Sequence, residues 1–201
     1  MLDNLATLLV FCFLGTGTPG PNNVMLMTSG MNYGVRRTLW HILGVATGVP
    51  VMVVGVGLGL NEAFDRLPWL ATALKYVCAI YLVYLAYRIA VARPEMAEDG
   101  ELKVSGKPLT YLQAAAFQWV NPKAWFIVTT ALSVYALPVS AAASTLIIAA
   151  CFLLSGTVTA STWTVLGDKL RILLSDPRRL KIFNLGAAVT LVLTLVPAFV
   201  G

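Results

Sequence analysis

Long apolar runs, separated by short polar or charged segments, make up almost the whole chain. Six runs stand out, at about residues 4–33, 38–60, 67–90, 109–136, 141–166 and 180–200. Each is about as long as the roughly 20-residue helix that crosses a bilayer core, or longer. No polar face recurs at helical spacing, which disfavours a soluble bundle. The pattern predicts an all-α integral membrane protein with six transmembrane helices and no separate soluble domain.

Composition and charge placement support this interpretation. The chain is 58% hydrophobic and only 11% charged, with a net charge of +5, whereas soluble domains are about 25% charged. Most Lys and Arg residues lie on three connections, namely Arg36 and Arg37; Arg88, Arg93, Lys103 and Lys107; and Lys169, Arg171, Arg178, Arg179 and Lys181. The opposite side has Arg66, with Asp3, Glu62 and Asp65. Because cytoplasmic loops are enriched in basic residues, we expect both termini outside. A signal peptide is disfavoured because Asp3 is the only early charge.

Two of the runs contain residues that an uninterrupted helix does not tolerate. The first contains TPGPNN at residues 18–23, and the fourth contains WVNPKAW at residues 119–125. Proline removes a helix hydrogen bond and clashes with the preceding turn. Asn121 followed by Pro122 is typical of an N-cap residue and a first helical position, so a new helix begins there. The sequence therefore predicts that helices 1 and 4 are broken.

One charged segment, ARPEMAEDGELKVSGKP, divides the chain into two groups of three runs. We interpret residues 1–201 as a single transporter domain, with halves at about 1–92 and 109–201 and a cytoplasmic linker at about 93–108. Since three is odd, the second half enters the membrane in the opposite sense. Matching interruptions in two such halves are typical of an inverted repeat that holds a transport site.

The two breaks suggest a specific chemistry. A half-helix that begins inside the membrane presents free N–H groups and the positive end of its dipole, both of which attract an anion such as a carboxylate. Lys123 is an ionisable residue deep in the fourth run and could neutralise that carboxylate. The alternatives are a proline kink that binds no ligand, and a Lys123 that pairs only with carbonyl groups at the break.

The motifs TPGPNN, NYGVRRTLWHILGVATG, YLVYLAYR and WVNPKAW, in this order, resemble the LysE/RhtB family of amino-acid exporters. FQWVNPK and LSVYALP are most similar to its cysteine and O-acetylserine branch. The resemblance implies a multi-pass protein of the bacterial inner membrane that exports amino acids, driven by the proton gradient, and makes a homodimer plausible. Its signature positions here are Pro19, Gly20, Pro21, Asn22, Asn121, Pro122 and Lys123.

The predicted substrate-binding residues come from both breaks and from the third run. They are Thr18, Pro19, Gly20, Pro21, Asn22, Asn23, Tyr81, Tyr84, Trp119, Asn121, Pro122, Lys123 and Trp125. Tyr81 and Tyr84 share a helix face, and packing is the alternative role. A deep positive charge with no Asp or Glu at the same depth favours small neutral substrates, such as cysteine, O-acetylserine, threonine or homoserine, over lysine and arginine.

Four further positions or pairs carry expectations of their own. His41 is interpreted as an interfacial residue beside Trp40, with a proton relay as the alternative. Lys75 is expected to extend toward the outer interface. Gly44 and Gly48 permit close helix packing, either within a protomer or across a dimer. Trp163 is interpreted as an interfacial residue.

Other classes of function explain the sequence less well. An enzyme needs a nucleophile with a base or paired carboxylates, and every Asp and Glu lies in a loop or near the end of a run. A structural membrane protein would not need two matched breaks. We predict no metal, cofactor or nucleic acid; the expected partners are a small-molecule substrate and membrane lipid.

Overall fold

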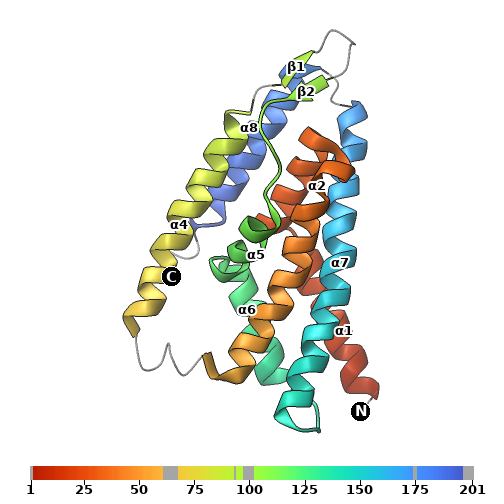
Figure 1. Cartoon of the computed structure of the whole chain (residues 1–201), viewed down its shortest axis with the longest axis vertical. Helices are drawn as coiled ribbons and strands as arrows, with labels where there is room; N and C mark the ends of the chain where they lie inside the picture. Colours follow the sequence, from red (N-terminus) through yellow and green to blue (C-terminus); the bar gives the residue numbers. More distant parts are fainter. Residues whose placement is uncertain (1, 61–67, 93, 97–101, 174–175, 197–201) are drawn as a thin grey trace.

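The computed structural model describes residues 2–60, 68–92, 94–96, 102–173 and 176–196, and helices dominate this part of the chain (Figure 1). The elements are α1 (Leu2–Gly17), α2 (Pro21–Gly55), the short π-helix η1 (Val56–Leu60), α4 (Pro68–Ala90), β1 (Pro94–Met96), β2 (Leu102–Val104), α5 (Tyr111–Trp119), α6 (Pro122–Val134), α7 (Ala141–Leu173) and α8 (Pro177–Leu193). The predicted positions of Glu62, Asp65, Arg66, Arg93 and the C-terminus lie outside the described residues.

The first predicted run is interrupted at its prolines. α1 ends at Gly17 and α2 begins at Pro21, with Gly20 as the N-cap residue. Proline is tolerated there because the first N–H groups of a helix have no intrahelical partner. The predicted break in the first helix is therefore present.

A sharp reversal at Gly34 divides α2. Gly34 has a φ of 76°, which glycine adopts without steric cost. The hydroxyl oxygens of Ser29 and Thr38 lie 3.0 Å apart, whereas nine residues of continuous helix would advance by about 13.5 Å. Residues 21–33 thus complete the first predicted run, and residues 35–60 match the second. The reversal comes just before the predicted loop residues Arg36 and Arg37.

The fourth predicted run is also divided into two helices. α5 begins at a capping box, in which the Thr110 hydroxyl accepts from the Gln113 backbone N–H and the Gln113 side chain accepts from the Thr110 backbone N–H. α5 ends at Trp119, and α6 begins at Pro122 with Asn121 as its N-cap residue. The predicted break and its N-cap residue are both present.

The linker departs from the all-α prediction. β1 and β2 pair antiparallel, with Pro94 opposite Val104 and Met96 opposite Leu102. Backbone N–H and C=O groups outside helices still need partners, and two short antiparallel strands satisfy each other. Val104 is buried in a small cluster with Met31, Ala92 and Leu180, so the linker also packs against the helices.

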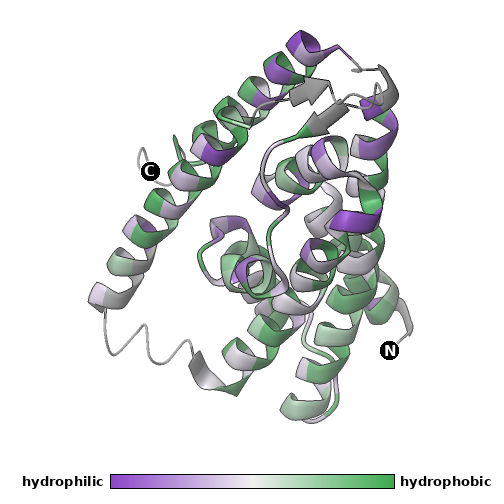
Figure 2. Ribbon diagram, turned by 45° about the horizontal axis from the view of Figure 1, so that its top comes forward, coloured by the Kyte–Doolittle hydropathy of each residue, from purple (hydrophilic) through white to green (hydrophobic). Residues whose placement is uncertain are grey.

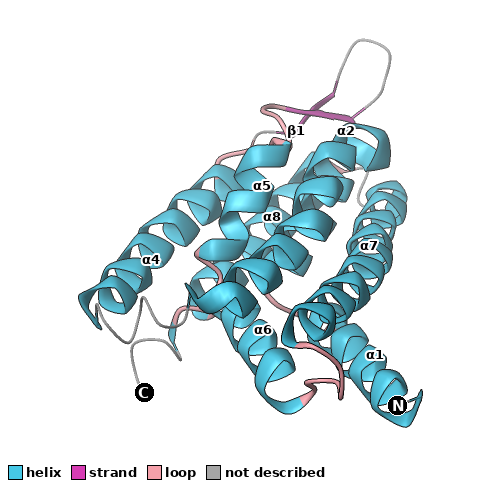
Figure 3. Ribbon diagram, turned by 60° about the horizontal axis from the view of Figure 1, so that its bottom comes forward, coloured by secondary structure: helices cyan, strands magenta, loops and turns pink. Residues whose placement is uncertain are grey.

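The two halves of the chain are interleaved. α7 lies alongside α1 and α2, α5 packs on α2, and α4 pairs with α8 (Figures 1 and 3). One apolar cluster joins α1, α2, α6 and α7 around Phe152. Another joins α4, α5, α8 and the start of α2 around Phe117. Because each cluster draws on both halves, neither half forms a core of its own.

Two described stretches, Pro21–Gly59 and Ala141–Arg171, are long enough to cross a membrane, and each contains an 18-residue segment with a mean hydropathy of 2.0. The first contains the Gly34 reversal and so combines parts of two predicted runs. Large apolar side chains also cover the outer surface; Ile80, Leu112 and Phe126 are 71%, 74% and 68% exposed. Exposed apolar surface on this scale is typical of a surface that contacts lipid or protein.

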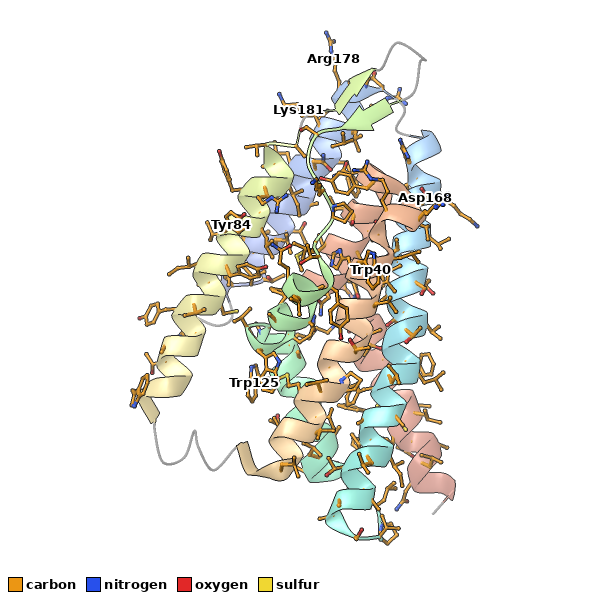
Figure 4. All side chains as sticks on the ribbon, viewed as in Figure 1. Trp40, Tyr84, Trp125, Asp168, Arg178 and Lys181 are labelled. Carbon is orange, nitrogen blue, oxygen red and sulfur yellow. The ribbon has the colours of Figure 1, made fainter. Side chains whose placement is uncertain are left out.

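The polar end of the molecule is the end that carries β1 and β2. Hydrophilic residues gather there on α7 and α8 (Figure 2), and Arg178 and Lys181 lie at this end (Figure 4). The reversal lies at the same end, because the hydroxyl of the neighbouring Tyr33 donates to the Ser105 carbonyl just after β2, while the N-terminus lies at the other end (Figure 1). Basic connections therefore gather at one end, as the charge pattern predicted.

Candidate functional site

The first break is held by side chains that satisfy the carbonyl groups at the end of α1. The Asn23 amide donates to the carbonyl oxygens of Thr16 and Thr18, both at 2.8 Å. The Trp163 indole of α7 donates to the Gly17 carbonyl at 3.1 Å. The last carbonyls of a helix lack intrahelical partners, and these bonds supply them.

The second break is held in a similar way. The Asn121 side chain accepts from the Lys123 backbone N–H at 3.2 Å, which caps α6. The Trp125 indole donates to the Trp119 carbonyl at 2.8 Å, and the Cys78 thiol of α4 donates to the Val120 carbonyl. Freed polar groups are thus satisfied by protein, as a buried interruption requires.

Side chains also join the two breaks directly. The Asn22 and Gln118 amides form a reciprocal pair, with N···O distances of 2.7 and 3.2 Å. The Lys123 ammonium donates to the Thr18 carbonyl at 2.6 Å and to the Thr18 hydroxyl at 2.9 Å. Residues about 100 positions apart in the sequence therefore form one polar cluster.

Positive charge is concentrated at the start of α2. Its N-cap residue is Gly20, so no side chain caps this end. A Cβ atom at Gly20 would lie 2.9 Å from the Lys123 Cδ and 3.2 Å from its Nζ. The ammonium thus lies beside the positive end of the α2 dipole. An anion at this point would be stabilised by the Lys123 ammonium and by the helix dipole.

A cavity of about 30 Å³, here called the break cavity, lies next to this cluster. Its lining includes Gly15, Thr16, Gly20, Asn22, Asn23, Asn121 and Lys123 from the breaks, Val45 and Val49 from α2, and Gly156, Thr159 and Ala160 from α7. A single water needs about 10–15 Å³. The break cavity therefore has room for about two or three waters, and an amino acid would need the helices to move apart.

Most predicted break residues lie at this cluster. Gly20, Asn22, Asn23, Asn121 and Lys123 line the break cavity, and Thr18 accepts from Lys123. Pro21 and Pro122 each occupy a first helical turn, while Pro19 is exposed between α1 and α2.

The four predicted aromatic residues pack beside the cluster rather than line the break cavity. Trp119 and Trp125 contact each other edge to face, with ring centroids 6.1 Å apart. Tyr81 lies 5.9 Å from the Phe117 ring and 6.1 Å from the Tyr84 ring. Tyr84 is on α4 and 47% exposed (Figure 4). A contact of these residues with substrate stays a prediction.

Sequence reasoning missed Gln118, Cys78 and the role of Trp163. A signal existed for Gln118, because a polar residue inside an apolar run is costly unless it is paired; the structure buries it completely. Trp163 was interpreted only as an interfacial residue, and the structure adds a role at the first break, where its indole donates to the Gly17 carbonyl. Cys78 had no such signal, since a cysteine in an apolar run normally only packs.

The structure also places His41, Lys75 and the pair Gly44 and Gly48. His41 is only 1% exposed, so the interfacial interpretation was wrong; the helix turns its ring inward while Trp40 is 66% exposed. Lys75 is exposed on α4. Gly44 and Gly48 pack against α5, where a Cβ at Gly44 would lie 2.7 Å from the Ala114 Cβ. The glycine pair is therefore used within the protomer.

Comparison with known proteins gives a consistent result. The family model described as LysE type translocator matches residues 13–196. Proteins named cysteine/O-acetylserine efflux protein from Escherichia coli (strain K12), Shigella sonnei (strain Ss046) and Shigella flexneri are each 33% identical over 128 residues. The match covers 63% of this chain and 63% of each relative's length. No solved structure matches.

The family match includes both breaks and every residue that lines the break cavity. The chain belongs to the LysE family of translocators.

Proposed function

We propose that the protein exports small neutral amino acids or their derivatives from the cytoplasm across the bacterial inner membrane. The substrates would be of the cysteine, O-acetylserine, threonine or homoserine type. The observation that carries the proposal is the position of the Lys123 ammonium beside the uncapped start of α2. Two positive features at one point favour a carboxylate. The names of the E. coli and Shigella relatives agree with this class of substrate.

The route would pass between the two halves of an inverted repeat. The packing supports this symmetry, because α1 contacts α7 and, correspondingly, α5 contacts α2, while α4 pairs with α8. If the two halves are exchanged, the contact of α1 with α7 becomes that of α5 with α2, and the contact of α4 with α8 becomes itself. The cluster that joins the breaks lies where the halves meet. Rocking of one half against the other would open the break cavity to each side in turn.

We place all 201 residues in one membrane domain with six transmembrane helices. The exposed apolar side chains support contact with lipid, and the basic end that carries β1 and β2 would face the cytoplasm. Export would be coupled to the proton gradient, as the family resemblance implied. A homodimer remains a proposal without support from Gly44 and Gly48, which pack internally.

The topology gives a direct test. We expect a reporter that is active only in the cytoplasm to work when inserted after Gly106 in the linker and to fail when fused after Gly201, because the basic connections stay inside. A reporter active only in the periplasm should give the reverse pattern. Cytoplasmic activity at Gly201 would contradict both the orientation and the inverted repeat.

Substrate charge tests the proposed function itself. In everted vesicles, whose cytoplasmic face is outward, we expect O-acetyl-L-serine to accumulate chemically unchanged. L-cysteine should compete with it at least about tenfold more strongly than L-lysine, since one unfavourable charge interaction of about 1.4 kcal/mol corresponds to tenfold. Vesicles without the protein are the control. Competition by L-lysine with equal potency would overturn the assignment of Lys123 to the substrate carboxylate.

A further inference from the structure

A second cavity, of about 60 Å³, lies between α2, α4 and the segment that leads into α5. We call it the His41 cavity. Its polar lining includes Ser29, Asn32, Tyr33, His41, Arg88 and Lys107. Since one water needs about 10–15 Å³, the cavity has room for several waters or for the polar end of a small molecule. None of its described lining residues also lines the break cavity.

Two buried side chains at the His41 cavity have polar atoms without a partner. His41 is 1% exposed, and neither of its ring nitrogens has a hydrogen bond to any residue that the structure describes. Asn32 is 4% exposed; its amide N–H donates to the Asn184 Oδ1 at 3.1 Å, while among the described residues its own Oδ1 and the Asn184 Nδ2 have no partner. An unsatisfied buried polar group costs about 1–3 kcal/mol. The unpaired amide atoms of Asn32 and Asn184 are complementary to each other, so it is chiefly the His41 ring that indicates a ligand in this cavity.

The charges of the lining indicate which ligand. Arg88 and Lys107 are cationic, and no Asp or Glu is among the described lining residues. Two cations without an acid favour a carboxylate, which Arg binds with two parallel hydrogen bonds. Asn32 Oδ1 is an acceptor, and a neutral histidine provides one more. The same cavity thus offers acceptors for an ammonium group.

We infer that the His41 cavity is a second amino-acid site, in which Arg88 and Lys107 bind the carboxylate and His41 and Asn32 accept from the ammonium. The inference rests on the proposed export function. The segment 21–33 connects the two cavities: Asn22 lines the break cavity, and Asn32 and Tyr33 line the His41 cavity. Ten residues of helix span about 15 Å. With the cytoplasm at the basic end, this site loads the amino acid before it reaches the breaks.

Binding stoichiometry provides the test. Radiolabelled O-acetyl-L-serine is titrated against the purified full-length protein in detergent. We expect two sites per protomer in the wild type, and one in each of Arg88→Met, His41→Leu and Lys123→Ala. The double variant Arg88→Met/Lys123→Ala should bind none. Arg36→Met is the matched control, because it removes an exposed cation that lines neither cavity, and it should keep both sites.

Two further measurements separate binding from folding. His41→Leu replaces unpaired nitrogens with an apolar side chain, so its melting temperature should equal or exceed that of the wild type; a His41 that only supported the fold would give a lower one. In everted vesicles, Arg88→Met should raise the apparent KM about tenfold and change the maximal rate less than twofold.

The outcomes distinguish the two proposals. One site in the wild type, lost in Lys123→Ala and kept in Arg88→Met, would overturn the second site and leave the export proposal intact. No binding by a folded wild type would overturn both. N-acetyl-O-acetyl-L-serine lacks the ammonium, so equal affinity of the Arg88-dependent site for this analogue would make that site a simple anion site and overturn the inference.

Discussion

Lys123→Ala is expected to lower kcat/KM for export about 100-fold, whereas Lys123→Arg should lower it about tenfold or less. The Lys123 ammonium lies at the uncapped start of α2 and bonds to Thr18. Hydrogen bonds to a charged group contribute about 1.5–3 kcal/mol, and 1.4 kcal/mol corresponds to about tenfold. Alanine removes the positive charge, while arginine keeps the charge but places it at a different distance from the backbone. Initial export rates in everted vesicles measure the difference.

Two controls show whether Lys123 acts on substrate or only holds the breaks together. Lys181→Ala removes an exposed cation from α8 and should leave transport unchanged. Thr18→Val removes one of the two acceptors of Lys123 but keeps the backbone carbonyl, so transport should fall only a few-fold. If Thr18→Val is as damaging as Lys123→Ala, the lysine acts through the link between the breaks. If Lys123→Ala transports normally, the carboxylate site lies elsewhere.

Gly30→Ala and Gly167→Ala should each destabilise the protein by about 3 kcal/mol, at the upper end of the usual cost of overpacking. At these glycines the backbones of α2 and α7 are in close contact. A Cβ at Gly30 would overlap the Thr164 carbonyl oxygen, and one at Gly167 would overlap the Met27 carbonyl oxygen. Backbone atoms block both methyl groups, so the helices themselves must separate. For about 200 residues this corresponds to a fall in Tm of about 10 °C.

Gly186→Ala is the matched control for this prediction. Gly186 lies within α8, and a Cβ there would meet no atom of the described residues within 4 Å. Alanine is favoured over glycine in a helix by about 1 kcal/mol, so this variant should melt at or slightly above the wild-type temperature. Thermal unfolding of the three variants in the same detergent makes the comparison. Equal melting temperatures for all three would contradict the close approach of α2 and α7.

The sequence alone predicted the helical segments and both interruptions. Proline and glycine act on the backbone of their immediate neighbours, so the ends of helices at Gly17 and Trp119 and the restarts at Pro21 and Pro122 follow from local chemistry. Asn121 was recognised as an N-cap residue for the same reason, and its side chain accepts from the Lys123 N–H. The reversal at Gly34 was placed only approximately, because the neighbouring Arg36 and Arg37 gave the stronger signal.

Only the tertiary structure decided which groups meet. The Asn22–Gln118 pair and the contact between Lys123 and Thr18 join residues about 100 positions apart, and no local pattern specifies such a distance. Gly44 and Gly48 permit close packing against any helix, and only the tertiary structure shows that this helix is α5. His41 belongs to a helix with apolar residues on all sides, so the sequence did not distinguish an inward from an outward ring. Helical periodicity sets the angle between side chains on one helix, but contacts with neighbouring helices set which side faces inward.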